Sequence, residues 1–417
     1  MKKFIALFLA AVILLPILAS CGRKKLDEPI EFIIANDIHY ISPSLLGDEN
    51  SDLDGVQYSR DGKIVHYISE ITDAFINEVI EKKPKALILA GDLTLNGARL
   101  SHEELVGKLK SVKDAGIDVL IIPGNHDVDK TAVDYSGEKP QEAEALDSNG
   151  FIELYAQLMP DGIDCDPSSQ SFIYKAAEKL WILMLDTNIY GQCYAKDLTL
   201  DWVEEKLKAA QADKIDVITV SHQNIYAHSE LLSFGYQLYN ADKLISLYEK
   251  YGILCNLSGH IHLQSIVDNK SVPEIATSSL AITGTHYGMI SYDGRELAYR
   301  AESLNVSAYA NKMGFDNADL LDFSKYATSF FEEIASKQAA ESLAGSGISE
   351  ENIAIMAETY AKINSAYFEG KPIDKSEYSA GLEQWELYIE ESFIAKYIMS
   401  MLKNPDGGGL EITIKID

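Results

Sequence analysis

The stretch that decides the fold is Asp118-Val-Leu-Ile-Ile-Pro-Gly-Asn-His-Asp127. Its apolar half predicts a short buried strand, and the Pro-Gly pair that follows stops the strand abruptly. The last three residues, Asn125, His126 and Asp127, then lie on the loop past the carboxyl end of the strand. Ligands bind at this edge of α/β sheets. The stretch therefore brings three polar side chains to a potential ligand site.

Two earlier segments repeat this pattern. Apolar runs and helical spacing alternate along the chain, with strands predicted at 31–35 and 86–90 and helices at 64–81 and 99–115. The first strand leads into Asp37 and His39, and the second into Asp92. A strand–helix–strand series predicts a parallel sheet with right-handed crossovers, so all three strand exits share one edge. The two-residue period of an extended chain also predicts that Asp37 and His39 point to the same side.

Two further strand exits carry imidazoles. An irregular segment follows at 128–171, with one helix predicted at 151–158. The next predicted strands are 172–175, 181–185, 217–220 and 253–257, and the helices among them are 200–211 and 241–251. Short strands are then predicted at 265–267, 274–276, 289–292 and 296–301. The strand at 217–220 leads into His222. The strand at 253–257 leads into His260 and His262. Five strand exits thus carry residues capable of ligation.

The last part of the chain, 304–417, has a different character. Its pattern is helical and acidic, with breaks at 345–347 and 370–372 and a helix start at Ser349. One continuous helix face is predicted from Trp385, Tyr388, Ile389, Ser392 and Phe393. Alternation at 410–416 predicts a strand that returns to a sheet edge. The sequence leaves open whether this region caps the site or binds a protein partner.

The collected side chains are carboxylates, imidazoles and one amide. Borderline divalent metals take such ligands, and the lack of cysteine among them disfavours a structural zinc site. The formal net charge of -28 argues against a duplex nucleic acid held by phosphate contacts. It suits a small substrate whose negative charge is met locally by metal ions.

In their order along the chain, these motifs resemble those of the calcineurin-like metallophosphoesterase family. The matching motifs are Asp37-x-His39, Gly91-Asp92, Gly124-Asn125-His126-Asp127, Ser221-His222 and Gly259-His260-x-His262. The resemblance covers about residues 30–300. The run Gly91-Asp-Leu-Thr-Leu-Asn-Gly97 is similar to members that act as cyclic-nucleotide and related phosphodiesterases.

The resemblance implies an α/β fold in which two mixed β-sheets pack as a sandwich flanked by helices, here over residues 30–303. It implies two transition-metal ions (Mn, Fe, Zn, Ni or Co), whose identity the sequence leaves open. One ion would be held by Asp37, His39, Asp92 and His262, and the other by Asp92, Asn125, His222 and His260. His126 would face the substrate, and Asp127 would hold the ring of His126.

The expected function is hydrolysis of a phosphodiester in a small molecule. Two metals would lower the pKa of a bridging water, and the resulting hydroxide would attack phosphorus in line. His126 would stabilise the developing charge or protonate the leaving oxygen. Arg99 and His228 are candidate substrate-binding residues, although a helix-surface arginine and an exposed loop histidine fit the same pattern. The alternatives are a phosphomonoesterase with the same site and a surface binding module whose site is vestigial.

The amino terminus has the pattern of a targeting segment. Two lysines precede an apolar run at 4–18, which is followed by Leu18-Ala-Ser-Cys21. This arrangement resembles a bacterial lipobox, which implies a signal peptide at 1–20, lipidation of Cys21 and a tether at 21–29. The mature protein would then be extracytoplasmic and anchored to a membrane. An ordinary signal peptide with an incidental cysteine is the alternative, and a disulfide between Cys165 and Cys193 stays open.

Overall fold

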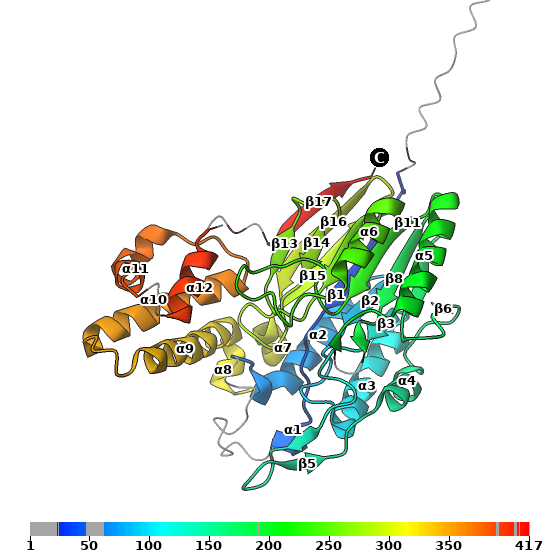
Figure 1. The fold of residues 1–417 in the computed structure, drawn as a ribbon. Helices are drawn as coiled ribbons and strands as arrows, with labels where there is room; N and C mark the ends of the chain where they lie inside the picture. The colour runs from blue at the N-terminus through cyan, green and yellow to red at the C-terminus, as the bar shows by residue number, and fades with distance from the viewer. Residues whose placement is uncertain are drawn as a thin grey trace, which may run out of the picture.

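The computed structural model describes residues 23, 25–46, 62–189, 192–388, 392–403, 407 and 409–416. Two β-sheets lie face to face, with helices on their outer faces, and a group of C-terminal helices lies beside them (Figure 1). Both sheets are mixed. This architecture confirms the expected sandwich of two mixed sheets flanked by helices.

The first sheet has six strands in the order β17-β16-β15-β1-β2-β3. Their bounds are β1 Ile30–Ala35, β2 Ala86–Ala90, β3 Asp118–Ile122, β15 His286–Tyr292, β16 Glu296–Ser303 and β17 Glu411–Lys415. β1, β2 and β3 are parallel, as the strand–helix series predicts, and their connections are α2 (Ile68–Lys82) and α3 (Arg99–Asp114). A single-turn helix, η3 (Val65–Tyr67), precedes α2, so the α-helix starts later than expected.

The second sheet has seven strands in the order β13-β14-β12-β11-β8-β7-β6. Their bounds are β6 Asp164–Cys165, β7 Phe172–Ala177, β8 Leu180–Leu185, β11 Asp216–Ser221, β12 Cys255–Ser258, β13 Ser265–Val267 and β14 Glu274–Ala276. β8, β11, β12 and β14 are parallel neighbours, and the helices α5 (Asp197–Ala212) and α6 (Ala241–Tyr251) cover their outer face. The parallel strands of both sheets carry their polar motifs at their carboxyl ends.

Alternating side chains on β1 show how the layers are held together. Phe32 and Ile34 point into the apolar core between the two sheets. Ile33 and Ala35 point to the other face, where they pack with residues of α2 and α3. The last four residues of β1, from Phe32 to Ala35, are all buried and apolar, as is typical of parallel sheets covered on both faces.

The segment between β3 and β7 is largely irregular, as expected. It contains a two-stranded sheet of β4 (Ala132–Asp134) and β5 (Gln141–Ala143), and the helix α4 (Ser148–Tyr155). A second pair, β9 (Asn188–Ile189) and β10 (Gln192–Cys193), follows β8. The short helix α1 (Pro43–Leu46) starts within a segment that the sequence assigns to a loop.

The C-terminal region is mostly helical and has its own core. Its elements are α7 Val306–Met313, α8 Ala318–Leu321, α9 Phe323–Leu343, α10 Glu350–Phe368, η4 Lys375–Tyr378, α11 Ser379–Glu386 and α12 Phe393–Met401. Ser349 caps α10 by accepting a hydrogen bond from the N–H of Asn352, as predicted. The strand β17 pairs with β16, which confirms the predicted return to a sheet edge.

The prediction of one helix face through Trp385 and Phe393 is wrong. α11 ends at Glu386, and Ser392 starts a new helix by capping the N–H of Ala395. Trp385 is buried in the helical core and donates a hydrogen bond to the carbonyl of Met356. Ser392 is a helix start because its hydroxyl competes for backbone groups, and helical spacing alone does not show this.

The described part of the expected tether lies against the sheets. Arg23 pairs with the buried Asp216, and Lys25 pairs with Asp293. Cys21 and the segment 1–22 lie outside the described residues, so the structure does not test the lipidation site. Among the described helices, none combines the length and apolar character needed to cross a bilayer. Cys165 and Cys193 are free thiols, so the disulfide left open by the sequence is not formed.

Three histidines outside the strand exits, two of them buried and one half-buried, predict acid sensitivity. Burial lowers the pKa of His66, His102 and His286 to about 4, whereas an unfolded histidine titrates near 6.5. Between these values the unfolded chain binds more protons, so the free energy of unfolding falls as the pH falls from 6.5 to 4. Each histidine contributes a slope of up to about 1.4 kcal/mol per pH unit.

Urea unfolding of the metal-free protein at several pH values measures this slope. His66→Asn removes one of the three groups and should make the dependence shallower. Equal slopes in the variant and the natural protein would contradict the assignment for His66.

Candidate metal centre

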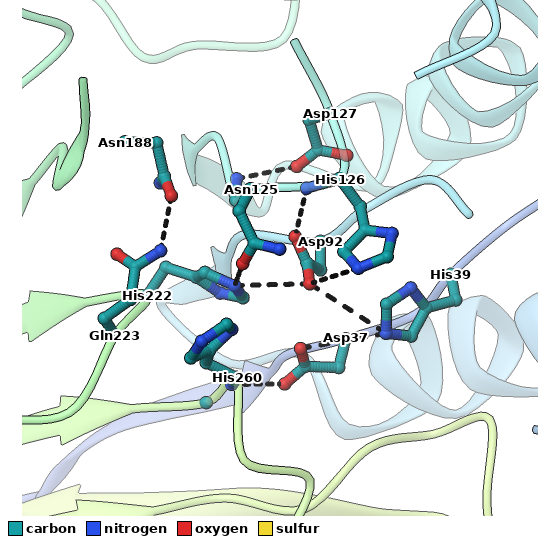
Figure 2. Close-up of polar contacts among 12 residues, drawn as sticks. Asp37, His39, Asp92, Asn125, His126, Asp127, Asn188, His222, Gln223 and His260 are labelled. Atoms are coloured by element: carbon teal, nitrogen blue, oxygen red, sulfur yellow. Dashed lines mark hydrogen bonds and ion pairs between the residues drawn. The ribbon is translucent and has the colours of Figure 1, made fainter. Parts of the chain in front are cut away.

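Five strand exits meet at one edge of the sandwich. Asp37 and His39 follow β1, Asp92 follows β2, and Asn125 follows β3 of the first sheet. The second sheet adds His222 after β11, and His260 and His262 after β12. Figure 2 shows Asp92 between the side chains of His39, His126 and His222. The convergence predicted from parallel topology is therefore present.

The backbone achieves this convergence through left-handed residues. Asp37, His39, Asp92, His260 and His262 all have φ between 50° and 66°, although none is glycine. Such conformations cost roughly 1 to 3 kcal/mol each and cluster at functional sites. The expected mechanism for Asp37 and His39, alternation along an extended strand, is wrong, because β1 ends at Ala35.

Two glycines allow the loops to approach one another. A Cβ at Gly124 would lie 2.1 Å from the backbone nitrogen of Asp92. A Cβ at Gly259 would lie 2.6 Å from a carboxylate oxygen of Asp37. The glycines of these two motifs are therefore required by close packing of the strand exits, before any metal is considered.

The first group of side chains consists of Asp37, His39, Asp92 and His262, whose potential ligand atoms lie within 4.8 Å of one another. The Nε2 atoms of His39 and His262 are 2.9 Å apart. Asp37 Oδ1 is buried with no hydrogen-bond partner among the described residues, while His262 Nε2 lies 3.3 Å from it. Imidazole nitrogens and a buried carboxylate oxygen that face one another in this way fit a cation between them.

The second group consists of Asp92, His222 and His260, whose potential ligand atoms also lie within 4.8 Å of one another. Asn125 joins it, because Asn125 Oδ1 lies 3.0 Å from His222 Nε2 (Figure 2). Asp92 belongs to both groups. The two groups match the two ligand sets that the resemblance implies, and their donor chemistry fits transition-metal ions.

Backbone carbonyls orient two of the imidazoles. His222 Nδ1 lies 2.9 Å from the carbonyl of Ala90, and His260 Nε2 lies 2.8 Å from that of Gly235. A ring nitrogen that donates to a carbonyl leaves the other nitrogen with a lone pair for a metal. His222 therefore presents Nε2, and His260 presents Nδ1, to the centre.

Burial and mutual charges set the protonation states. Burial lowers the pKa of His39 well below its ordinary value and that of His260 to about 4. Burial also opposes charge on Asp92 and His222, but their attraction prevails: the pKa of Asp92 lies well below its usual range, and that of His222 is raised to about 9. His222 must lose this proton to act as a ligand.

Comparisons with known proteins agree with this geometry. Residues 30–264, more than half of the chain, match the family model described as calcineurin-like phosphoesterase. The chain belongs to the calcineurin-like phosphoesterase family. Residues 305–407 of this phosphoesterase match a second model, described as the C-terminal domain of cyclic nucleotide phosphodiesterase. No curated protein matches the sequence.

Similar solved structures share little sequence with this phosphoesterase. A dimetal phosphatase from Danio rerio is 13% identical, with 66% of this chain and 97% of that chain covered and a TM-score of 0.49. A purple acid phosphatase from yellow lupin seeds is 13% identical, with 66% and 51% covered and a TM-score of 0.40. A putative 5'-nucleotidase from Staphylococcus aureus is also 13% identical, with 73% and 59% covered and a TM-score of 0.40.

His126 lies at the phosphoesterase site, but Asp127 does not hold its ring. His126 Nδ1 lies 2.7 Å from the carbonyl of Leu95, and His126 Nε2 lies 4.0 Å from Asp92 Oδ2. The carboxylate of Asp127 instead accepts hydrogen bonds from the N–H groups of Gly124, Leu93 and Thr94, and from the Thr94 hydroxyl. The expectation for Asp127 is therefore corrected: it ties the loop after β3 to the loop after β2.

Replacing Asp127 by alanine should destabilise the phosphoesterase. The substitution leaves three buried N–H groups without an acceptor, and each such group costs about 1 to 3 kcal/mol. We expect the free energy of unfolding to fall by roughly 3 kcal/mol or more, as measured by urea unfolding. Lys130→Ala, at an exposed neighbouring position, is the control. If the free energy of unfolding fell no more in Asp127→Ala than in Lys130→Ala, the structural role of Asp127 would be contradicted.

The two candidate substrate-binding residues lie away from the centre. Arg99 Nε donates to Glu144 Oε1 at 2.5 Å on the surface, where α3 begins. His228 is buried, with Nε2 3.2 Å from Glu274 Oε2, and it borders a separate, smaller pocket. Both expectations are corrected, because these two side chains face acidic partners outside the metal-site pocket.

Sequence reasoning missed Lys63. Its side chain lines the pocket at the centre, although only 3% of the residue is exposed. After burial, the nearby charge of Lys63 is the next cause that lowers the pKa of His39. It also lowers the pKa of His126, after burial and against the opposing effect of Asp92. A single lysine before a helix carries no sequence signal, so only the folded chain shows that this cation is close to the site.

Asn188 and Gln223 were also missed. Asn188 Nδ2 donates to the carbonyl of Pro123 at 2.5 Å, and Gln223 Nε2 donates to Asn188 Oδ1 at 2.5 Å (Figure 2). These bonds link the loop that carries Asn125 to the loop that carries His222. The sequence shows Asn188 at a strand exit, but it does not show the partner on which this positioning role depends.

A pocket of about 640 Å³ opens from the phosphoesterase centre. One wall carries Asp92, His126, His260, His262 and Lys63. The opposite wall comes from α9, α10 and α12, and the loop 232–236 completes it. The C-terminal helices therefore form part of the pocket, in keeping with the first of the two roles that the sequence left open for them.

Proposed function

We propose that this protein hydrolyses the phosphodiester bond of a small molecule with two bound transition-metal ions. The observation that carries the proposal is the pair of ligand groups that share Asp92 and face one pocket together with His126. The ligands would be Asp37, His39, Asp92 and His262 for one ion, and Asp92, Asn125, His222 and His260 for the other. Nitrogen and oxygen donors accept Mn, Fe, Zn, Ni or Co.

The bound ions supply Lewis acidity, which polarises phosphoryl oxygens and lowers the pKa of a coordinated water. Residues of the chain supply proton transfer and positive charge. His126 is oriented by the Leu95 carbonyl, so its Nε2 faces the pocket and can hold or release a proton there. Burial lowers the pKa of His126, so a proton held on Nε2 would be given up readily to the leaving oxygen. Lys63 adds positive charge for the substrate phosphate.

Two observations favour a diester over a monoester. Among the described residues that line the pocket, Lys63 is the only lysine or arginine, which suits the single charge of a diester better than the double charge of a monoester. The match of residues 305–407 to the C-terminal domain of cyclic nucleotide phosphodiesterase points the same way. Hydrolysis of a monoester by the same residues is the second candidate.

Turnover of bis-p-nitrophenyl phosphate and p-nitrophenyl phosphate, with each metal added back in turn, separates these candidates. We expect a higher kcat/KM for the diester. A clear preference for the monoester would favour the second candidate. If the reconstituted protein hydrolysed neither ester and held fewer than two equivalents of metal, a binding module with a vestigial site would be the better description.

We also propose that the protein is extracytoplasmic and anchored through a lipid on Cys21. The supporting observation is the run Leu18-Ala-Ser before Cys21, which resembles a lipobox. The described N-terminal residues pair with Asp216 and Asp293, at the end of the sheets opposite to the metal centre. The site would then face away from the membrane. Loss of the membrane-bound fraction in Cys21→Ser is the expected result, and unchanged fractionation would exclude the anchor.

Lys63→Met should weaken substrate binding. Methionine keeps the length of the side chain and removes its charge, and a charge-assisted hydrogen bond contributes about 1.5 to 3 kcal/mol. We expect kcat/KM for the diester to fall by roughly 10-fold to 100-fold, mainly through KM. Lys337→Met, at an exposed position of α9, is the control. A full loss of metal in Lys63→Met would show that Lys63 supports the centre instead of the substrate.

A further inference from the structure

Two consecutive serines lie between the exits of the two sheets. Ser278 and Ser279 follow β14, and both are fully buried. The N–H of Thr277 donates a hydrogen bond to the carbonyl of Ser258, the last residue of β12. Ser279 forms a parallel bridge with Asn36, directly after β1. The segment that carries the serines therefore contacts both sheets at the edge where the candidate metal ligands gather.

Each serine hydroxyl donates a hydrogen bond to the backbone of a candidate metal ligand. Ser279 Oγ donates to the carbonyl of Asp37 at 2.6 Å. Ser278 Oγ donates to the carbonyl of His262, also at 2.6 Å. The N–H of Ala281 donates to Ser279 Oγ at 2.9 Å, which orients this hydroxyl. Both ligands that accept the serine hydroxyls belong to the first group.

The two carbonyls that accept these bonds belong to residues with left-handed backbone. The angle φ is 52° at Asp37 and 58° at His262. Residues other than glycine seldom adopt this conformation, and it persists only where the surrounding structure imposes it. Each serine hydroxyl is part of such surroundings, because it bonds directly to the carbonyl of the strained residue.

The first group takes its ligands from both sheets. Asp37, His39 and Asp92 follow strands of the first sheet, whereas His262 follows β12 of the second. His262 Nε2 lies 3.3 Å from Asp37 Oδ1, so a small shift of one strand exit against the other would change the spacing of the ligands. Consecutive Cα atoms are about 3.8 Å apart along the chain, so neighbouring serines fix the two carbonyls relative to each other.

The second group has supports of a different kind. Its imidazoles, His222 and His260, are oriented by the carbonyls of Ala90 and Gly235. Within the described part of the chain, neither serine hydroxyl bonds to a residue that belongs only to the second group. The effect of the two hydroxyls is therefore confined to the first group.

We propose that Ser278 and Ser279 are positioning residues for the metal ion of the first group. Their hydroxyls hold the left-handed backbone of His262 and Asp37, and so keep one ligand from each sheet at the spacing that a metal ion needs. The inference rests on the proposed function for the presence of two metal ions, and it adds residues outside both ligand groups. Loss of either hydroxyl should weaken binding of the first ion and leave binding of the second unchanged.

Metal titration of Ser278→Ala and Ser279→Ala tests the inference. The metal-free protein is titrated with Co²⁺, and binding is followed by calorimetry and by visible absorption, which reports the coordination geometry. Partners that orient metal ligands typically contribute roughly 10-fold to 100-fold in metal affinity. We expect each variant to bind one of the two ions weaker by about this factor, with an altered absorption spectrum for that ion.

Two backgrounds identify which ion is weakened. Asn125→Ala removes a ligand of the second group, so the remaining ion reports on the first group. His39→Ala removes a ligand found only in the first group, so the remaining ion reports on the second. Addition of Ser278→Ala should weaken the remaining ion in the Asn125→Ala background only. Equal weakening in both backgrounds, or weakening only in His39→Ala, would overturn the inference.

Stability measurements distinguish positioning from general support of the fold. Thr72→Val is the matched control, because it removes a buried hydroxyl that donates to the carbonyl of Ile68 at 2.6 Å, outside both groups. Both Co²⁺ affinities should be unchanged in this control. If Ser278→Ala and Ser279→Ala lowered the Tm of the metal-free protein but bound both ions with the natural affinities, the serines would have only a structural role and the inference would be wrong.

The natural protein separates the inference from the proposed function. If it bound two equivalents of Co²⁺ and both serine variants bound them equally well, the inference would be overturned and the proposed two-metal centre would stand. If the natural protein bound fewer than two equivalents, the two-metal centre and the inference would both be overturned.

Discussion

The Asp92→Asn variant is expected to lose most of its bound metal and at least about 1,000-fold in kcat. Asp92 is the one carboxylate common to both ligand groups, and its Oδ1 also accepts a hydrogen bond from the N–H of His126 at 2.7 Å. Asparagine keeps this bond and the shape of the side chain but removes the negative charge. Metal ions supply several kcal/mol of transition-state stabilisation, and each 1.36 kcal/mol is a factor of ten in rate.

Elemental analysis and single-turnover kinetics on the same preparation measure the two effects together. Asp166→Asn is the matched control, because Asp166 is also a largely buried carboxylate. Its partners are Ser168, Ser169 and Thr199, and it lies outside both groups. The control should keep two equivalents of metal. If Asp92→Asn bound two equivalents of metal, Asp92 would not bridge the two ions.

The parallel strands could be predicted from the sequence because burial on both faces makes each a short apolar run. The runs that became β2 and β3 end where Gly91 and Pro123 break them, so their bounds were readable to within one residue. The division at α11 and α12 could not be read, since Trp385 and Phe393 keep a helical spacing across the break. Trp385 is buried in the helical core near the end of α11, and periodicity does not show where this helix stops.

The convergence of the strand exits could also be predicted, because it follows from the parallel topology. The backbone conformation that turns the residues towards one another could not be predicted. Residue type indicates the left-handed backbone at Asp37, His39 and Asp92 only weakly: aspartate and histidine adopt it more often than most residues, but glycine is favoured far more strongly. The surrounding loops impose it. The sequence therefore indicated which side chains meet, and it gave the wrong account of how Asp37 and His39 turn towards each other.

Roles that depend on partners distant in sequence were the least predictable. Asp127 is adjacent to His126, which suggested contact, yet the Leu95 carbonyl holds that ring. Arg99 and His228 lie near the motifs in the sequence, and each side chain faces a glutamate that the sequence does not link to it. Adjacency in the chain says little about contact when loops from two sheets meet.

The His126→Ala variant is expected to keep two equivalents of metal and to lose roughly 100-fold to 10,000-fold in kcat, the range typical of a general acid. His126 Nε2 is 4.0 Å from Asp92 Oδ2, and its Nδ1 is engaged by Leu95, so the ring faces the pocket without belonging to either ligand group. Asn125→Ala is the matched contrast on the same loop, since Asn125 Oδ1 faces His222 Nε2 and its loss should lower metal occupancy.

Substrates with different leaving groups reveal the role of His126. A p-nitrophenolate departs without a proton, whereas an alkoxide needs one. If His126 protonates the leaving oxygen, His126→Ala should slow an alkyl diester far more than bis-p-nitrophenyl phosphate. Equal losses for both substrates would assign His126 to charge stabilisation at the phosphoryl group, and loss of metal would place it among the ligands. In each case the Leu95 carbonyl fixes the ring, so only Nε2 can act on the substrate.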